Sequence, residues 1–448
     1  MAIHFYQNPI GVGMSVKLKV DLLVRNISQL VTMDPVVDGS PDVVGPRKGE
    51  EMRSLGIIEN GAVAVKDGAI VSIGKDADVM KDIGAVRRGA ILNGSGRCVI
   101  PGFVDAHTHA IFAGTREDEL AMSAMGKSYL QILAEGGGIQ KTVRDTRAAS
   151  DEEIIKATRK RLNGMLLNGT TTAEVKSGYG LNYEQELRLL RLLRRLGSQH
   201  PITIVPTFMG AHAVPPEFKD TPEKYVDIIV EKVLPKVREE EMAKFCDVFC
   251  DEGAFTAAQS ERVLAKAKEL GIGLKLHVDE FASIGGLDVA MKLKATSCEH
   301  LLMTSKDKFQ ALASSSCIAV LLPGTPFVLA SEKYANARDM IDAGVPVALG
   351  TDLCPNAYIE SMQFVMALAC SRMRMHPSEA LCAATVNAAH AIGQGEFAGM
   401  FRNGRRADII MLDVPSYAQI PYRIGTNLVH SVVKSGNLVV ERGQHVQT

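Results

Sequence analysis

The sequence has no excess of charge of either sign. Its 448 residues include 50 Lys and Arg and 51 Asp and Glu, which gives a formal net charge of −1. A protein of this composition has no global positive field to attract a nucleic acid or an anionic membrane. Partners of both kinds are therefore disfavoured.

The sequence also lacks long hydrophobic runs. No window reaches the ~20 apolar residues of a membrane-spanning helix, and residues 1–19 show no secretory leader pattern. The eight cysteines follow no regular spacing and mostly lie in apolar runs, which is typical of reduced thiols in an intracellular protein. Cys246 and Cys250 lack the second Cys or His pair of a zinc finger and are interpreted as strand residues. We expect a cytoplasmic protein.

The two ends of the chain carry β patterns. Residues 16–32 and 408–413 are apolar or alternating, and hairpins are predicted at 62–73 and 428–440. Residues 34–60, which are rich in Gly, Pro and charge, are predicted to form a surface loop. Neither end has enough strands to bury both faces of a sheet. We therefore predict one small β-sandwich domain built from residues 1–98 and 396–448.

The middle of the chain, residues 99–395, repeats a short apolar strand followed by a helical pattern. Strands are expected at residues 99–109, 170–176, 202–212, 246–253, 273–280, 297–302, 318–323 and 345–352. Amphipathic helices are expected at residues 151–167, 184–196, 261–270 and 332–342. Eight strand and helix units predict an α/β fold, a (β/α)8 TIM barrel. The basic segment 188–195 is interpreted as a solvated outer helix.

Histidines and a carboxylate lie at the predicted strand ends, where the chemistry of such barrels is located. His107 and His109, at i and i+2 behind an apolar run, point to one face of a strand. His277 ends the fifth strand and Asp352 the eighth. Taken singly, His277 could be a core histidine and Asp352 a helix cap. Together they predict a divalent-metal site with an open position for water.

Four further roles follow from the same positions. Asp105 lies two residues before His107, so its side chain points to the same face of the predicted strand and could support the ligands as a neighbouring polar group. Asp352 could take a proton from water and move it toward the leaving nitrogen. His300, after strand six, could orient the water or stabilise the oxyanion, and Glu280 could bond a ring N–H or shuttle a proton. The alternative for His300 and Glu280 is a structural hydrogen bond in a wet cavity.

Seven motifs carry a resemblance to a known family. They are Pro-Gly-Phe-Val-Asp-Ala-His-Thr-His (101–109), Arg-Glu-Asp-Glu (116–119), Gly-Gly-Gly (136–138), Thr-Thr-Thr-Ala-Glu-Val-Lys-Ser-Gly-Tyr-Gly (170–180), Thr-Phe-Met-Gly-Ala-His-Ala-Val-Pro-Pro-Glu (207–217), His-Val-Asp-Glu-Phe (277–281) and Leu-Gly-Thr-Asp (349–352). In order from about residue 20 to 440, the chain resembles the imidazolonepropionase family of the amidohydrolase superfamily. The His-x-His pair is common to the superfamily, whereas 176–180 and 210–217 are specific to this family.

The resemblance implies hydrolytic ring opening of 4-imidazolone-5-propanoate to N-formimino-L-glutamate in histidine degradation, by a homodimer. It implies one zinc or iron ion held by His107, His109, His277 and Asp352. It implies a small-molecule substrate held by Arg116, Tyr179, His212 and Glu280. His and Asp also accept manganese. From chemistry alone, a propionate tail suits the Arg116 guanidinium, whose alternative is an ordinary surface arginine.

The hypothesised mechanism is attack of activated water on the ring carbonyl, with His212 and His300 stabilising charge on the oxygen, followed by C–N cleavage. Binuclear members of the superfamily use a lysine at the end of strand four. Residues 249–255 contain no lysine, so one ion is expected.

One position departs from the family pattern. The family usually continues from Asp352 with Leu-Asn-Pro-Gly, whereas this chain has Leu353, Cys354, Pro355 and Asn356. A thiol is a weaker hydrogen-bonding group than an amide. A substrate contact is therefore lost, or taken over by Asn356.

Two alternatives remain from the sequence. The first is another amidohydrolase, such as an aminohydrolase that releases ammonia from a heterocycle. The second is a non-catalytic scaffold with this fold, which should have lost ligands. The sequence retains all four.

Overall fold

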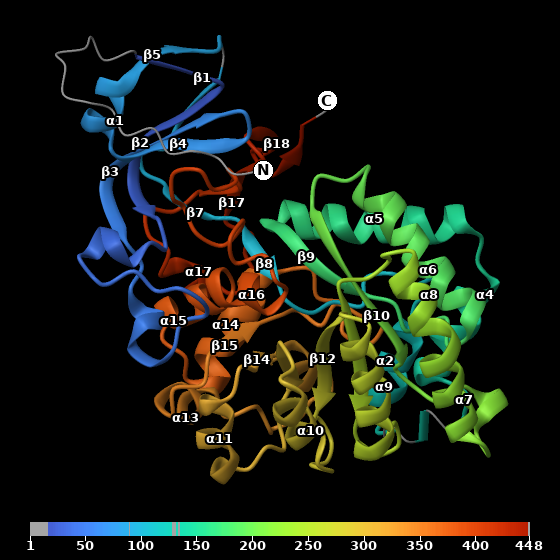
Figure 1. The fold of residues 1–448 in the computed structure, drawn as a ribbon. Coiled ribbons are helices and arrows are strands. Elements are labelled where there is room, and N and C mark those ends of the chain that lie inside the picture. The colour runs from blue at the N-terminus through green and yellow to red at the C-terminus, as the bar shows by residue number, and fades with distance from the viewer. Residues whose placement is uncertain (1–16, 89, 128–130, 133–134, 447–448) are drawn as a thin grey trace.

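The computed structural model describes residues 17–88, 90–127, 131–132 and 135–446. A strand barrel surrounded by helices lies beside a sheet built from both chain ends (Figure 1). The expectations for the first 16 residues lie outside the described ranges. Among the described helices, none combines the length and the apolar character needed to cross a membrane.

The barrel is an eight-stranded parallel sheet in the order β15-β14-β13-β12-β11-β10-β9-β8. Its strands are β8 (Phe103–Asp105), β9 (Thr170–Lys176), β10 (Thr203–Ala211), β11 (Phe245–Cys250), β12 (Gly273–Val278), β13 (Ser297–His300), β14 (Ile318–Leu321) and β15 (Val347–Leu349). Each strand lies within or beside a range predicted from the sequence, and Cys246 and Cys250 are strand residues as interpreted. The predicted (β/α)8 barrel is confirmed.

An isolated parallel β-bridge between Thr108 and Leu353, together with side-chain hydrogen bonds, joins the chain after β8 to the chain after β15. The Asp105 carboxylate accepts the backbone N–H of Thr351 at 3.0 Å and its hydroxyl at 2.6 Å. The carbonyl of His107 accepts the Asp352 N–H at 3.0 Å, and His109 N–H donates to Leu353 O at 2.9 Å. These bonds tie the ends of the first and last strands together, so that the residues after them meet.

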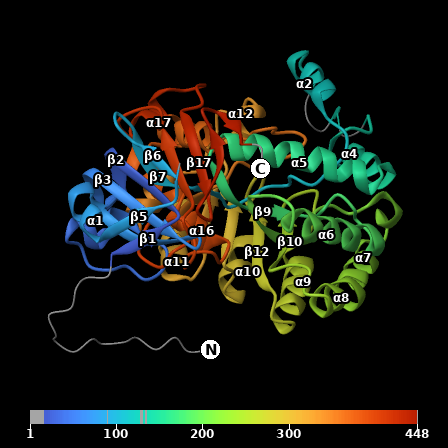
Figure 2. The ribbon, with the colours of Figure 1, turned by 90° about the horizontal axis from the view of Figure 1, so that it is seen from above.

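Helices surround the barrel, and the first of them stands clear of the others (Figure 2). They are α2 (Glu117–Ala124), α4 (Gly138–Ala148), α5 (Asp151–Leu167), α6 (Tyr183–Gly197), α7 (Pro222–Ile228), α8 (Leu234–Glu239), α9 (Ala257–Glu269), α10 (Gly286–Leu293), α11 (Phe309–Ser314), α12 (Gly324–Val328), α13 (Ala337–Asp342), α14 (Met362–Met373), α15 (Pro377–Ala383), α16 (Val386–Ala391) and α17 (Gln419–Tyr422). Ser150 and Glu153 form a capping box that starts α5 at the predicted residue. The predicted start of α13 at residue 332 was wrong, because the Asn336 side chain caps the helix there.

The chain ends share one nine-stranded sheet, ordered β19-β18-β17-β16-β7-β2-β3-β4 with β6 on β2. Its strands are β2 (Leu22–Val31), β3 (Ile57–Lys66), β4 (Ala69–Lys75), β6 (Ile91–Asn93), β7 (Cys98–Pro101), β16 (Ile409–Leu412), β17 (Val429–Lys434), β18 (Asn437–Glu441) and β19 (Gln444–His445). A second layer packs on β2 and β3 and contains β1 (Leu18–Val20), β5 (Ile83–Val86) and α1 (Asp76–Asp82). Both predicted hairpins are present, and the β-sandwich from both ends is confirmed.

Two further local predictions were wrong. Residues 99–109 are not one strand, because the chain passes between sheets at Gly102, where a Cβ would overlap the Thr171 side chain. Residues 34–60 are not simply a surface loop. They contain the 3-10 helices η1 (Pro35–Asp38) and η2 (Gly49–Arg53), and Arg47 is buried where its backbone bonds Asn387.

Candidate metal and substrate site

Four side chains that the sequence predicted as metal ligands converge at the carboxyl ends of the barrel strands. His109 Nε2 lies 3.2 Å from His277 Nε2. Asp352 Oδ1 lies 3.4 Å from His107 Nε2 and 3.6 Å from His109 Nε2. Ligand atoms ~2.1 Å from a common zinc-like centre at tetrahedral angles lie about 3.4 Å apart. These distances therefore fit ligands of one ion, and His107, His109 and Asp352 lie close enough together to hold it.

The chemistry of the donors fits as well. Burial lowers the pKa of His107, His109 and His277 well below the ordinary value, so the rings are neutral and their lone pairs are available. His107 Nε2 is buried and has no hydrogen-bond partner among the described residues. Three neutral imidazoles and one carboxylate support a divalent metal ion here.

Asp352 is held from the side opposite the imidazoles. Its Oδ2 accepts a hydrogen bond from Thr325 Oγ1 at 2.5 Å, while Oδ1 faces His107 and His109. Burial raises the pKa of Asp352 to about 7, and the Thr325 hydroxyl acts in the opposite direction. Thr325 was not predicted from the sequence, although it follows strand β14 as other site residues follow their strands.

A pocket opens over these ligands. It is lined by His109, Arg116, Ile139, Tyr179, His212, Phe249, His277, Glu280, Phe281, His300, Thr325, Leu329, Asp352, Cys354 and Asn356. The list includes every residue that the sequence analysis assigned to substrate binding, whereas His107 lies beneath the pocket. The structure thus brings all the predicted site residues together.

Arg116 is 6% exposed, so the alternative of an ordinary surface arginine was wrong. Its Nε and Nη2 donate to Glu119 Oε2 at 2.8 and 2.6 Å. The other oxygen of Glu119 accepts the Gly138 N–H at 2.8 Å. Glu119 therefore fixes the guanidinium against the start of α4 at the edge of the pocket.

His212 stacks on His109, with ring centroids 4.8 Å apart and planes at 20°. Its Nδ1 lies 3.0 Å from the carbonyl oxygen of Gly178, which can only accept a hydrogen bond. Burial lowers the pKa of His212 to about 4. In the neutral ring the proton is therefore on Nδ1, and Nε2 is a hydrogen-bond acceptor.

The loop that carries Tyr179 is held by the buried Glu186. The Glu186 carboxylate accepts the backbone N–H groups of Gly178, Gly180 and Leu181 at 2.8 to 3.2 Å. Tyr179 itself is 2% exposed, and its ring centroid lies 6.0 Å from that of His109. Tyr179 was predicted from the sequence, but the carboxylate that holds its loop was not.

Glu280 and His300 face each other across the pocket wall. Glu280 Oε2 lies 3.6 Å from His300 Nε2, whereas the ring of His277 bonds Asp247. Burial raises the pKa of Glu280 well above its ordinary value and lowers that of His300 to about 4. Asp251 is, after Glu119 and Glu186, the third buried carboxylate that holds part of the site. It accepts the backbone N–H of Glu280 at 2.8 Å.

The backbone is left-handed at three strand ends of the site. Asp279 has φ 54°, His300 has φ 73° and Asp352 has φ 53°. Non-glycine residues rarely adopt this region, and such strain of about 1–3 kcal/mol per residue is found mainly at functional sites. A left-handed residue thus ends β13 or follows β12 or β15, the strands whose C-terminal ends carry His300, Glu280 and Asp352 of the pocket lining.

Cys354 and Asn356 line the same pocket beyond Asp352. The Cys354 sulfur accepts the Ala357 N–H at 3.2 Å, and the Cys354 N–H donates to the Ala357 carbonyl at 3.1 Å, so two bonds close the turn. The thiol thus has a structural partner, and Asn356 supplies the amide of this segment.

Comparison with known proteins gives the family. Residues 98–439 match the amidohydrolase family. The imidazolonepropionase of Alkaliphilus metalliredigens is 45% identical over 428 residues, which cover 95% of this chain and 100% of that protein. The imidazolonepropionase of Symbiobacterium thermophilum is 46% identical over 429 residues, or 95% and 98% of the two chains.

Solved structures share the fold at lower identity. An adenosine deaminase from Xanthomonas campestris with bound zinc has a TM-score of 0.72 at 18% identity, over 96% of this chain and 95% of that one. A guanine deaminase from E. coli has a TM-score of 0.72 at 17% identity, over 94% and 100%. The chain belongs to the amidohydrolase family and, within it, to the imidazolonepropionases.

Proposed function

We propose that this chain hydrolyses 4-imidazolone-5-propanoate to N-formimino-L-glutamate with one divalent ion, zinc or iron. The observation that carries the proposal is the convergence of His107, His109, His277 and Asp352 beneath a pocket that contains Arg116. The identity of about 45% to imidazolonepropionases supports the reaction. A bound ion would lower the pKa of a water molecule and polarise the ring carbonyl.

Arg116 is proposed to bind the propionate tail. A guanidinium binds a carboxylate through two parallel hydrogen bonds, which fix orientation as well as affinity. Because Glu119 holds the guanidinium from one edge, the group is presented to the pocket in one orientation. The ring of the substrate then lies toward the imidazoles.

Asp352 is proposed to receive the proton of the attacking water and to pass it to the leaving ring nitrogen. Thr325 holds one carboxylate oxygen, so the other faces the ligand set. The transfer of this proton completes C–N cleavage without a charged nitrogen leaving group. Tyr179 closes the pocket beside the histidine stack.

The hydrogen bond to Gly178 changes the role proposed for His212. A neutral ring with its proton on Nδ1 cannot donate from Nε2 to an oxyanion, but it can accept a ring N–H of the substrate. Stabilisation of the developing charge then falls to His300, whose neutral ring retains one N–H donor. Glu280, next to His300, is proposed to set which nitrogen carries that proton.

The identity of the product tests this proposal. Purified protein with measured metal content is incubated with imidazolone propionate, and the products are identified by mass spectrometry together with an ammonia assay. Formiminoglutamate without free ammonia is the expected result. Stoichiometric ammonia release would instead identify an aminohydrolase, and no reaction in the metal-loaded protein would favour a scaffold.

A further inference from the structure

Five charged side chains fill the barrel beneath the proposed ion site, and the mechanism above uses none of them. They are Glu174 and Lys176 on β9, Asp247 on β11, Lys275 on β12 and Glu299 on β13, and each is 0% exposed. Burying charge is costly unless each group is paired. Such a cluster therefore requires an explanation.

Each lysine pairs with one oxygen of a carboxylate that lies near the imidazoles, Lys176 with Asp247 and Lys275 with Glu299. Lys176 Nζ lies 2.7 Å from Asp247 Oδ2 and 2.7 Å from Glu174 Oε1. Lys275 Nζ lies 3.1 Å from Glu299 Oε1. Asp247 Oδ1 is thereby left for another partner, and Glu299 Oε2 lies 4.0 Å from Lys176 Nζ.

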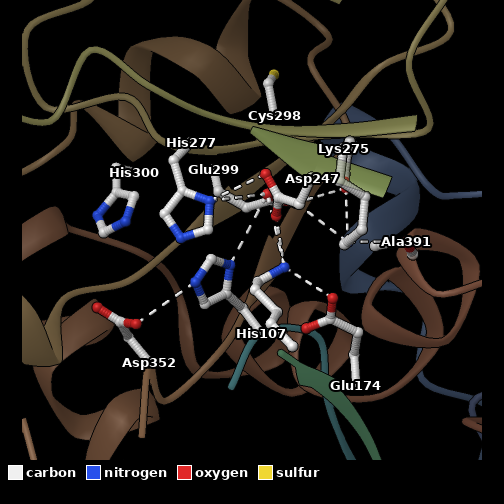
Figure 3. A network of polar contacts seen from close by, with 12 residues as sticks. His107, Glu174, Asp247, Lys275, His277, Cys298, Glu299, His300, Asp352 and Ala391 are labelled. Atoms are coloured by element: carbon white, nitrogen blue, oxygen red, sulfur yellow. Dashed lines mark hydrogen bonds and ion pairs between the residues drawn. The ribbon is translucent and has the colours of Figure 1, made fainter. Parts of the chain in front are cut away.

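Those second oxygens face the Nδ1 atoms of two proposed ligands. Asp247 Oδ1 lies 3.1 Å from His277 Nδ1. Glu299 Oε2 lies 3.8 Å from His107 Nδ1 and 3.9 Å from His277 Nδ1. Figure 3 shows Asp352 on one side of the His107 ring and these carboxylates on the other.

We infer that Asp247 and Glu299 are positioning residues for the divalent ion, held in place by Lys176 and Lys275. A carboxylate at Nδ1 keeps the ring proton there, so that Nε2 presents its lone pair to the ion. Glu299 Oε2 and His107 Nδ1 are both buried and have no hydrogen-bond partner in the described part of the chain, and they lie 3.8 Å from each other. The inference rests on the ion site of the proposed function.

The cluster also explains why one ion suffices. Asp247, His277 and Glu299 lie close enough together to hold a cation of their own. The Lys176 ammonium already bonds Asp247, and the Lys275 ammonium already pairs with Glu299. The negative charge of this second group is therefore compensated by lysines.

The chain offers a matched control for a test. Glu174→Gln removes one negative charge from the same network, but the Glu174 carboxylate accepts from Lys176 Nζ and the Thr108 backbone N–H and does not face a ligand ring. Asp247→Asn and Glu299→Gln remove the same charge at the imidazoles. Metal-free full-length proteins are titrated with Zn²⁺ in competition with a chelator, and their thermal unfolding is recorded.

We expect Asp247→Asn and Glu299→Gln to weaken Zn²⁺ binding roughly 10- to 100-fold, and Glu174→Gln less than about threefold. If a single variant does not fold, Asp247→Asn with Lys176→Met, or Glu299→Gln with Lys275→Met, keeps the net charge and is titrated instead. Equal Zn²⁺ affinities of the three single variants would overturn the inference. If the variants lose Zn²⁺ affinity as expected but the wild type does not turn over imidazolone propionate, the proposed reaction is refuted and the inference about Asp247 and Glu299 stands.

Discussion

The Thr325 hydroxyl lies 2.5 Å from Asp352 Oδ2, on the side of the carboxylate turned away from the histidines. The oxygen that faces His107 and His109 is Oδ1, at 3.4 and 3.6 Å. The two carboxylate oxygens therefore differ. Thr325 fixes Oδ2 by a hydrogen bond, and Oδ1 is the oxygen proposed to take up the proton. The proposed proton transfer depends on Oδ1 being free of the Thr325 hydroxyl.

Thr325→Val should lower kcat roughly 10- to 100-fold, because a hydrogen bond to a charged group contributes about 1.5–3 kcal/mol. Thr325→Ser retains the hydroxyl and should stay within a few-fold of wild type. Steady-state kinetics and metal analysis of both variants check this prediction. Equal kcat for the two variants would show that the hydroxyl is not needed.

Arg116→Lys should raise KM for imidazolone propionate about 10- to 100-fold with a smaller change in kcat. The ammonium keeps the charge but loses the paired hydrogen bonds and the fixed edge against Glu119. An analogue that lacks the propionate carboxylate is the control, and its kcat/KM should be nearly the same for both enzymes. A similar loss with the analogue would assign Arg116 to folding of the pocket instead.

Asn356→Ala should raise KM more than about fivefold in the wild type and less in a Cys354→Asn background. The asparagine introduced at 354 can accept the Ala357 N–H that the thiol now accepts, and it adds an amide to the pocket. The double-mutant cycle measures this coupling directly. Additive effects in the two backgrounds would mean that Asn356 has not taken over the contact.

Stability should fall as the pH drops from about 6.5 toward 4, in part through His200. Its Nδ1 accepts the Ile202 N–H and its Nε2 donates to Asn163, while burial lowers its pKa to about 4. As the pH falls, His200 is therefore protonated in the unfolded chain before it is protonated in the folded chain. The free energy of unfolding falls by about 2 kcal/mol between pH 7 and pH 5 as a result. His200→Asn keeps the bond to Ile202 and should show a smaller drop in chemical denaturation; an unchanged drop would contradict the assignment.

The fold was largely predictable because its elements are specified locally. Eight apolar strands, two hairpin turns and the cap at Ser150 each have a signature within a few residues. The break at Gly102 was not predictable, since it depends on Thr171 in the neighbouring strand. The burial of Arg47 was missed for the same reason, because its partner Asn387 lies 340 residues away.

The site residues that lie at the ends of strands could be predicted from the sequence. The residues that hold these in place through hydrogen bonds could not. Glu119, Glu186 and Asp251 bond backbone N–H groups of loops, and no local pattern marks such a role. The charged network in the barrel did leave a signal, because Lys275 shares the parity of His277 within an apolar strand. The homodimer, the domain boundaries, the cytoplasmic location and the absence of nucleic-acid partners remain predictions.

The most direct test of the account combines turnover with metal removal. Protein of known metal content is mixed with imidazolone propionate, and ring opening is followed by the loss of ultraviolet absorbance. We predict formiminoglutamate formation that stops after chelation and returns when zinc or iron is added. Undiminished turnover by a protein shown to be free of metal would contradict the central role of the site formed by His107, His109, His277 and Asp352.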